Sequence, residues 1–209
     1  MKFNRNKLLA LSPLPLVLAS TSPYRRELLS HLQIPFSVIA PEVDETPLPD
    51  ETPEATALRL SQLKARAAQS AYPKALIIGS DQVATVDGLQ VGKPGSHAKA
   101  VEQLQLMSGK CVVFHSALSL YNSASGNMHS TSVPTTVAFR QLSAAQIEVY
   151  LRKDQPYNCA GSARIESLGI AVIEKLTGED PNALIGLPLI ALVDMLALEG
   201  MDVLTWKPA

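Results

Sequence analysis

Two adjacent arginines, Arg25 and Arg26, follow a hydroxyl-rich turn in the stretch LASTSPYRRELL, residues 18–29. Apolar residues precede the turn and leucines follow it, so the chain is predicted to pass from a strand into a helix here. Guanidinium groups match phosphate oxygens, and the free N–H groups at a helix N-terminus attract anions. The arginines therefore predict a phosphate-binding site, the alternative being a solvated helix face.

An aspartate, Asp81, follows the apolar residues of IIGSDQ, residues 77–82. An acid at the carboxyl end of an apolar strand lies where α/β proteins place their ligands. Asp81 is thus a candidate metal ligand or general base, and the alternative is an aspartate that begins a turn. Gly79 would permit close approach of a ligand or of another backbone.

Two further carboxylates, Asp44 and Glu45, lie in an acidic, proline-rich stretch, residues 41–53, that is predicted to be a loop. Mg²⁺ is usually held by carboxylates together with substrate phosphates. With Asp81 they form a candidate metal-and-base set, whereas a solvated acidic loop is the alternative.

Two lysines are candidate phosphate contacts. Lys93 stands between Gly92 and Pro94, which restrain its position, although no glycine-rich Walker loop precedes it. Lys64 lies on a predicted long helix, where a solvated lysine is the default interpretation.

The stretch CAGSARIE, residues 159–166, combines small residues with Arg164 and Glu166. Small residues let a ligand approach the backbone. The stretch is predicted to be extended, so Arg164 and Glu166 are expected on one face, either at a site or in a salt-bridged surface strand. The four histidines show no metal-binding spacing.

The elements that must position these residues alternate between strands and helices. Strands are predicted at 16–19, 36–40, from 75 to a turn at 87–88, in a hairpin within 111–140, and at 168–174. Helices are predicted at 23–32, 53–71, 97–108, 143–152 and 187–200. The class is therefore α/β with at least one antiparallel hairpin, and residues 15–209 are expected to form a single domain.

Composition excludes several classes of function. The chain has 209 residues, 46% of them hydrophobic, and a net charge of -1, which does not support a general nucleic-acid binder. No apolar run reaches the roughly 18–20 residues that a membrane helix needs. The basic, apolar start resembles a signal peptide, but Pro13 and Pro15 interrupt it. Residues 1–14 are interpreted as a poorly ordered extension and the protein as cytoplasmic.

Cys111 and Cys159 are the only cysteines, and they have no zinc-binding spacing. They are expected to be buried thiols in a reducing compartment, although one disulfide is the alternative.

Together these stretches resemble the Maf family of nucleoside triphosphate pyrophosphatases. The matches span residues 16–198 in the family's order: LASTSPYRRELL, PEVDET, RLSQLKA, IIGSDQV, GKP, FRQLS, CAGSARIESLG and GLPLIAL. The resemblance implies a mixed, elongated, twisted sheet flanked by helices, with two lobes around a cleft, often in a homodimer. It also implies a divalent cation, Mg²⁺ or Mn²⁺, and hydrolysis of the α–β phosphate link of a nucleotide with release of pyrophosphate.

The resemblance also implies roles for particular residues. The phosphate contacts would be Ser20, Arg25, Arg26, Lys64 and Lys93. The metal ligands would be Asp44, Glu45 and Asp81, with Asp81 also the catalytic base.

Three residues resemble the subgroup that acts on 7-methyl-GTP: Tyr24, Gln82 and Glu166. Some members have tryptophan at the position of Tyr24, which keeps the aromatic character. N7-methylation gives guanine a positive charge that an aromatic face and a carboxylate attract. One alternative is a dTTP/UTP pyrophosphatase of the same family, which typically has Asp-Thr at positions 81–82 and lacks the acid at 166. The other is a nucleotide-binding regulator of cell division with little turnover.

Overall fold

The computed structural model describes residues 14–207, so almost all of the predicted N-terminal extension lies outside the described residues. The strands are β1 (Leu16–Ala19), β2 (Phe36–Ile39), β3 (Leu76–Val86), β4 (Leu89–Val91), β5 (Cys111–Asn122), β6 (Met128–Phe139) and β7 (Ile173–Gly178). The α-helices are α1 (Pro23–Ser30), α2 (Pro53–Ala67), α3 (His97–Met107), α4 (Ala144–Asp154) and α5 (Leu189–Leu198). Two 3₁₀ helices span Ala160–Ser162 and Leu168–Val172.

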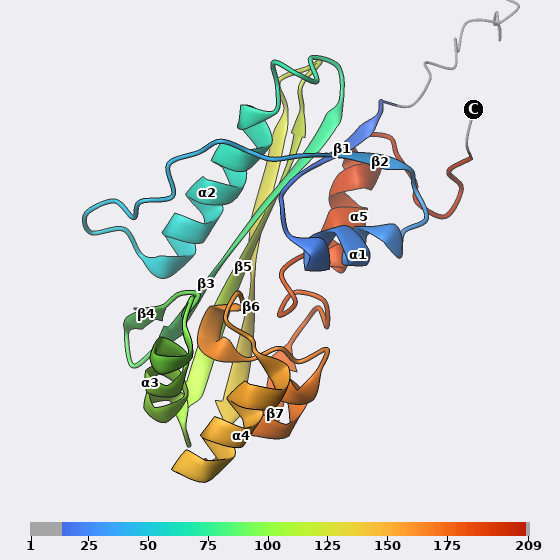
Figure 1. Ribbon diagram of the computed structural model, residues 1–209. Coiled ribbons are helices and arrows are strands. Elements are labelled where there is room, and N and C mark those ends of the chain that lie inside the picture. Colours follow the sequence, from blue (N-terminus) through green and yellow to red (C-terminus); the bar gives the residue numbers. More distant parts are fainter. Residues whose placement is uncertain (1–13, 208–209) are drawn as a thin grey trace, which may run out of the picture.

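One mixed sheet organises the described chain (Figure 1). Its strand order is β2-β1-β3-β5-β6-β7, and β4 pairs with the end of β3. β1 is parallel to β2 and β3, whereas the remaining pairs are antiparallel. The long strands β3, β5 and β6 run through the whole molecule, as Figure 1 shows. The predicted mixed α/β fold and the predicted hairpin are confirmed.

The starts of the helices follow from local sequence. Four helices begin after a residue whose side-chain oxygen accepts a hydrogen bond from the N–H three residues on: Ser22, Thr52, Ser96 and Ser143. Such caps satisfy N–H groups that have no partner inside the helix. Proline at the first position of α1 and α2 adds to this signal, since its missing N–H costs nothing there.

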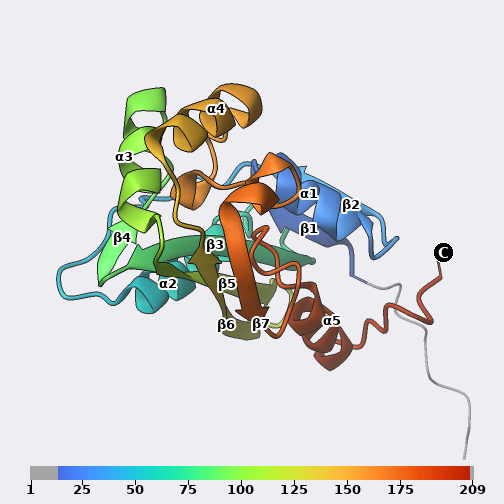
Figure 2. The same ribbon diagram turned by 90° about the horizontal axis from the view of Figure 1, so that it is seen from below.

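The core divides into two parts, one at each end of the long strands. At one end, α1 and α5 cover one face of the sheet and α2 the other, because residues of β1 alternate between the two faces. At the other end, a separate core joins α3 and α4 to the ends of β3, β5 and β6. Figures 1 and 2 show α3 and α4 side by side, away from α5. These are the two predicted lobes.

One predicted strand boundary is wrong, and Asp81 does not lie at the end of its strand. β3 continues to Val86, as the predicted turn at 87–88 requires, and Asp81 lies in its middle, because β5 pairs with β3 beyond the point where β1 stops at Gly79. The predicted strand at 168–174 starts as a 3₁₀ helix, and β7 begins only at Ile173. Gly169 allows this turn, since a Cβ there would lie 2.4 Å from the carbonyl oxygen of Arg164.

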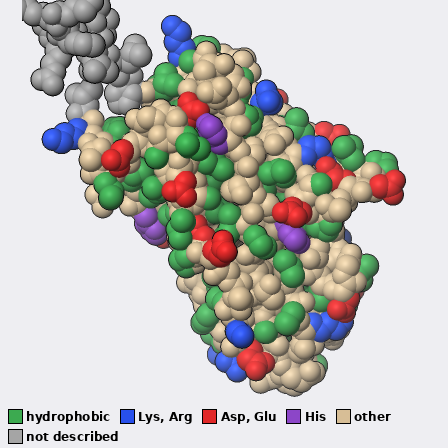
Figure 3. Space-filling model, turned by 180° about the vertical axis from the view of Figure 1, so that it is seen from behind, with side chains coloured by type: hydrophobic (Ala, Val, Ile, Leu, Met, Phe, Trp, Pro, Cys, Tyr) green, Lys and Arg blue, Asp and Glu red, His purple; other side chains and the backbone are tan. Residues whose placement is uncertain are grey.

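Charged side chains are mixed on the surface. On the face seen in Figure 3, acidic and basic side chains are interspersed rather than gathered by sign.

Cys111 is exposed and Cys159 is half-buried, both as free thiols, so the prediction of two buried thiols is wrong. Among the described residues, no helix combines the length and hydropathy that crossing a bilayer requires.

Candidate active site

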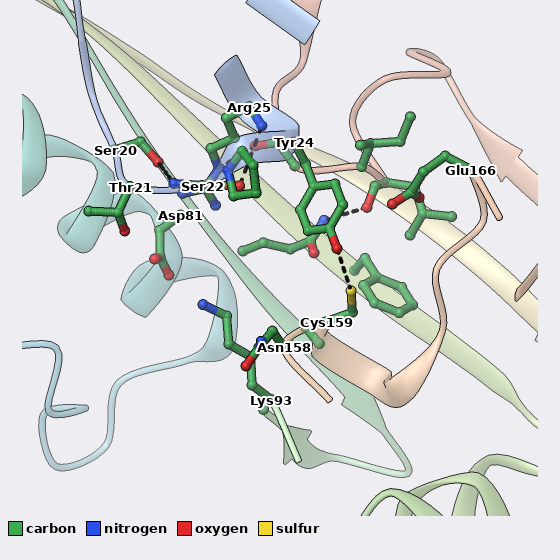
Figure 4. Close-up of a pocket in the computed structure, with 18 of the residues that line it drawn as sticks. Ser20, Thr21, Ser22, Tyr24, Arg25, Asp81, Lys93, Asn158, Cys159 and Glu166 are labelled. Carbon is green, nitrogen blue, oxygen red and sulfur yellow. Dashed lines mark hydrogen bonds between the residues drawn. The ribbon is translucent and has the colours of Figure 1, made fainter. Parts of the chain in front are cut away.

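A cavity of about 630 Å³ lies between the two lobes (Figure 4). Five segments line it: the β1–α1 turn, the middle of β3, the turn after β4, residues 158–166 and residues 184–186. Pro41 and Glu45 from the loop before α2, Lys64 of α2 and Phe114 of β5 complete it. Its volume falls within the usual range for small-molecule sites.

The β1–α1 turn forms one wall of the cavity. The Oγ of buried Ser20 accepts a hydrogen bond from the N–H of Ser22 at 3.1 Å. Ser22 in turn caps α1, accepting from the N–H of Arg25 at 3.4 Å. The turn therefore presents hydroxyl groups and the start of a helix to the cavity, an arrangement that attracts anions.

Arg25 is anchored in this wall by two backbone carbonyls. Its Nε donates to the oxygen of Gly186 at 2.9 Å and its Nη1 to the oxygen of Ser80 at 2.8 Å. Burial lowers the pKa of Arg25, while the charges of Asp81 and Glu45 oppose that shift. The guanidinium is thus held in place beside two carboxylates and lines the cavity.

Arg26 does not line this cavity. It is exposed and lines a second hollow, on the other side of the β1–α1 turn. Successive residues of an α-helix point in directions about 100° apart, so two adjacent arginines cannot share one face. The prediction that both arginines meet the same phosphates is therefore not supported for Arg26.

Lys64 joins two of the predicted carboxylates. Its Nζ lies 2.6 Å from Oδ1 of Asp81 and 2.7 Å from Oε1 of Glu45. Lys64 is buried, so the default interpretation of a solvated lysine is wrong. The hydrogen bond from Lys64 lowers the pKa of Glu45.

Gly79 explains how Lys64 reaches Asp81. A Cβ on Gly79 would lie 2.1 Å from the carbonyl oxygen of Ser61 and 2.6 Å from the nitrogen of Ala65, both on α2. The missing side chain thus lets the backbone of α2 pack directly on β3. Gly79 was predicted to permit close approach of a ligand or of another backbone. The structure shows the second of these, the close approach of the α2 backbone.

Asp44 lies apart from the other predicted metal ligands. Its Oδ1 accepts a hydrogen bond from the N–H of Thr46 at 2.9 Å, which turns the carboxylate into its own loop. Within residues 14–207, no three or more His, Cys, Asp or Glu side chains gather in a way that could hold a metal ion. Glu45 and Asp81, however, converge on one amine, and their hard oxygens suit Mg²⁺ when phosphates complete the shell.

Lys93 faces the carboxylates from the other lobe, and its turn is anchored on both sides. Gly92 accepts hydrogen bonds through its carbonyl oxygen from Gln103 at 3.0 Å and from the N–H of Gly161 at 3.4 Å. The N–H of Gly95 donates to the oxygen of Tyr157 at 2.9 Å. Lys93 itself is exposed and lines the cavity.

Aromatic and apolar side chains gather at the other end of the cavity, around Tyr24 and Glu166. Figure 4 shows the ring of Tyr24 between Glu166 and the end of the cavity that holds Ser20 and Asp81. The Tyr24 hydroxyl accepts a weak hydrogen bond from Sγ of Cys159 at 3.9 Å. Loss of solvent around Glu166 raises the pKa of its carboxyl.

Gln82 has its amide nitrogen fully engaged. Nε2 donates to Ser116 at 2.8 Å and to the carbonyl oxygens of Ala183 and Leu184 at 3.1 and 3.0 Å. Because two of these partners are carbonyls, only the NH₂ group can face them. Oε1 is therefore the atom of the Gln82 amide that can accept a hydrogen bond from a ligand.

Comparisons with known proteins place the chain in a family. The model of the family described as "Maf-like protein" matches residues 15–199. This chain belongs to the Maf family. It is 63% identical to a 7-methyl-GTP pyrophosphatase of Methylobacillus flagellatus over 91% of this chain and 99% of that protein. It is 61% identical to a protein of the same name from Thiobacillus denitrificans, over 91% of this chain and 95% of that one.

Among solved structures, the Ham1 protein of Staphylococcus aureus aligns with a TM-score of 0.45 at 18% identity. That alignment covers 61% of this chain and 72% of the Ham1 chain.

Every residue that lines the cavity lies within the Maf match. Sequence reasoning missed Phe114 and Asn158 among them, because neither stands in a pattern that indicates chemistry. It also misplaced Arg164, whose Nη2 donates to buried Asp154 at 2.8 Å and which does not line the cavity. The backbone turns at residues 165–167, where the N–H of Ser167 donates to the carbonyl oxygen of Arg164 at 3.1 Å, so Arg164 and Glu166 do not lie on one extended segment as predicted.

Proposed function

We propose that this Maf protein is a nucleoside triphosphate pyrophosphatase that hydrolyses 7-methyl-GTP to 7-methyl-GMP and pyrophosphate. One observation carries the proposal: a single cavity has buried or anchored cations and carboxylates at one end, and an aromatic ring with a carboxylate at the other. The names of relatives about 60% identical over most of the chain support the same activity.

The phosphate end suits attack of water on the α-phosphorus. Lys64 occupies Oδ1 of Asp81, while Oδ2 makes no hydrogen bond within the described part of the chain. In the proposal, Asp81 takes the proton of the attacking water through Oδ2. Arg25, Lys93 and the start of α1 hold the pyrophosphate that leaves, and their positive charge stabilises the charge that develops on it.

A divalent cation fits this end of the cavity. Glu45 and Asp81 would hold it together with the phosphates of the nucleotide. When bound, Mg²⁺ or Mn²⁺ would neutralise charge on the phosphates and so lower the barrier to attack.

The end of the cavity around Tyr24 and Glu166 suits a positively charged nucleobase. The face of Tyr24 attracts the delocalised positive charge of 7-methylguanine, an effect of about 0.5–2 kcal/mol. Glu166 adds Coulombic attraction and accepts hydrogen bonds from the N1–H and N2 amino edge. Oε1 of Gln82 is a further acceptor. GTP, dTTP and UTP lack the positive charge, so they gain less from this environment.

We also propose a cytoplasmic location and a homodimer. Both are consistent with a small-molecule nucleotide as the substrate. The proposed enzyme differs from a regulator with little turnover in one measurable respect, which is steady-state release of pyrophosphate.

The test is kcat/KM for 7-methyl-GTP, GTP, dTTP and UTP, with Glu166→Gln and the exposed-site control Glu174→Gln. The wild type should prefer 7-methyl-GTP. Glu166→Gln should reduce that preference about 5- to 30-fold, because a neutral amide replaces a charged acceptor. Glu174→Gln should leave it unchanged. Equal wild-type values for GTP and 7-methyl-GTP, or faster dTTP turnover, would contradict the substrate assignment. Absent turnover would favour a binding protein.

A further inference from the structure

A second hollow of about 500 Å³ adjoins the proposed active site. Its lining is Ser20, Thr21, Ser22, Pro23, Arg26, Glu27, Ser30, Phe36 and Val38. The first four of these residues form the β1–α1 turn and line both cavities. The turn is therefore the wall between the two, and its residues Thr21 and Pro23 are exposed.

The lining of this second hollow has a definite chemical character. Arg26 makes no side-chain hydrogen bond or ion pair within residues 14–207, so its guanidinium is available to a ligand. Phe36 and Val38 are two residues apart on β2 and project from the same face of the strand. Val38 is 43% exposed. The hollow thus offers a cation, an aromatic ring and an apolar floor.

The orientation of the proposed substrate points toward this hollow. Its base would lie by Tyr24 and Glu166, and its α-phosphate by Asp81. Figure 4 shows Ser20, Thr21 and Asp81 at the end of the cavity away from Glu166. The terminal phosphate would therefore lie at the β1–α1 turn, where the second hollow begins.

We propose that the second hollow binds a nucleoside attached to the terminal phosphate of the substrate. Dinucleoside triphosphates with 7-methylguanosine at one end would then be substrates as well as 7-methyl-GTP. This inference rests on the proposed function and extends it.

The reaction would be the same hydrolysis with a larger leaving group. The oxygen of water bonds to the phosphorus next to 7-methylguanosine, and the bond from that phosphorus to the bridging oxygen breaks. Asp81 accepts the proton of the water. The products are 7-methyl-GMP and the diphosphate of the second nucleoside, in place of pyrophosphate.

The lining favours a nucleoside over a simple anion. A base can stack on the ring of Phe36, and such stacking tolerates any base. Glu27 carries a carboxylate that repels a further phosphate but accepts hydrogen bonds from amino groups of a base. Arg26 then contacts the phosphate or ribose that joins the two halves.

The experiment compares 7-methyl-GTP with a triphosphate that joins 7-methylguanosine to adenosine. The full chain is assayed with Mg²⁺, and products are separated by chromatography. We expect 7-methyl-GMP and ADP, with kcat/KM within about tenfold of that for 7-methyl-GTP. Products of 7-methyl-GDP and AMP would overturn the inference, because they place the second nucleoside at the reacting phosphorus.

Variants separate the two cavities. Phe36→Leu keeps an apolar side chain but removes the ring, so kcat/KM for the dinucleotide should fall about fivefold or more. For 7-methyl-GTP it should change less than about twofold. Arg26→Gln should also impair the dinucleotide more than 7-methyl-GTP, whereas the exposed-site control Arg140→Gln should impair neither. Melting temperatures establish that each variant is folded.

The outcomes distinguish this inference from the function on which it rests. Turnover of 7-methyl-GTP without turnover of the dinucleotide overturns the inference alone. Equal effects of Phe36→Leu and Arg26→Gln on both substrates also overturn it. If neither substrate is hydrolysed, the proposed function fails and the inference fails with it.

Discussion

Lys64 contacts two carboxylates at once, and this shared contact marks the end of the cavity where the proposed reaction takes place. Carboxylates that pair with a buried lysine compensate for the solvation lost on burial. Here Asp81 and Glu45 lie 2.6 and 2.7 Å from its Nζ. The same lysine restrains Asp81, so that the second carboxylate oxygen keeps a defined position toward the cavity. Asp81 is therefore the residue whose loss should affect chemistry most directly.

Asp81→Asn should lower kcat by roughly 10²- to 10⁴-fold, the usual contribution of a general base. The amide keeps the volume of the carboxylate, so circular dichroism should show an unchanged fold. Asp194→Asn changes an exposed acid on α5 and should keep full turnover. A kcat near that of the wild type for Asp81→Asn would mean that another group activates the water.

Arg25→Lys should destabilise the protein as well as impair phosphate contact. A lysine cannot donate to the carbonyls of Gly186 and Ser80 in the geometry of the guanidinium fork. One buried carbonyl left without a donor costs about 1–3 kcal/mol, measurable by urea unfolding. Arg26→Lys, at an exposed position, should change the free energy of unfolding by no more than about 0.5 kcal/mol. Equal stabilities of the two variants would contradict the anchoring role.

At the scale of elements, the loop before α2 is tied to that helix by Glu51. Its carboxylate accepts hydrogen bonds from Arg59 at 2.7 and 2.8 Å and from Thr56 at 2.9 Å, both on α2. It also accepts from the N–H of Leu48 at 3.2 Å. The loop carries Glu45, and α2 carries Lys64. Glu51 therefore stabilises the arrangement that brings these two side chains together.

Glu51→Gln should lower the melting temperature at pH 7, and the difference should shrink in acid. The hydrogen bonds from Arg59 lower the pKa of Glu51 from 4.5 to about 2. A carboxyl whose pKa is lower in the folded than in the unfolded state stabilises the fold at pH values above the unfolded-state pKa. This stabilisation is lost as the pH falls from about 4.5 toward 2. Melting curves at pH 7, 5 and 3.5 test this. Glu174→Gln, with an exposed carboxylate, is the control, and a difference independent of pH would contradict the assignment.

At the scale of the whole molecule, the cavity is built from both lobes. The β1–α1 turn and Lys64 come from one, and Phe114 and residues 158–166 from the other. The long strands β3 and β5 connect the two cores. A nucleotide that fills the cavity touches both lobes, so its binding energy should add to the stability of the entire fold.

A non-hydrolysable analogue of 7-methyl-GTP, at about 100 times its Kd with Mg²⁺, should stabilise the fold by about 2.7 kcal/mol. For a chain of this length, that corresponds to a rise in Tm of about 5–11 °C. Excess chelator should reduce the rise, because the carboxylates of Glu45 and Asp81 then face the phosphates with no cation between them and repel them. An undiminished rise in chelator would contradict a role for the metal in binding.

Local features of this protein were determined by the sequence itself. The capped starts of four helices, the β5–β6 hairpin and the chemical type of the site residues depend on neighbours only a few positions away. Tertiary structure decided which of those residues meet. Lys64 reaches Asp81 because α2 packs directly on Gly79, whereas Asp44 turns into its own loop and Arg26 faces a second hollow. Backbone propensities and caps are local free energies, but the direction of a side chain and its partner are set by packing between segments distant in sequence.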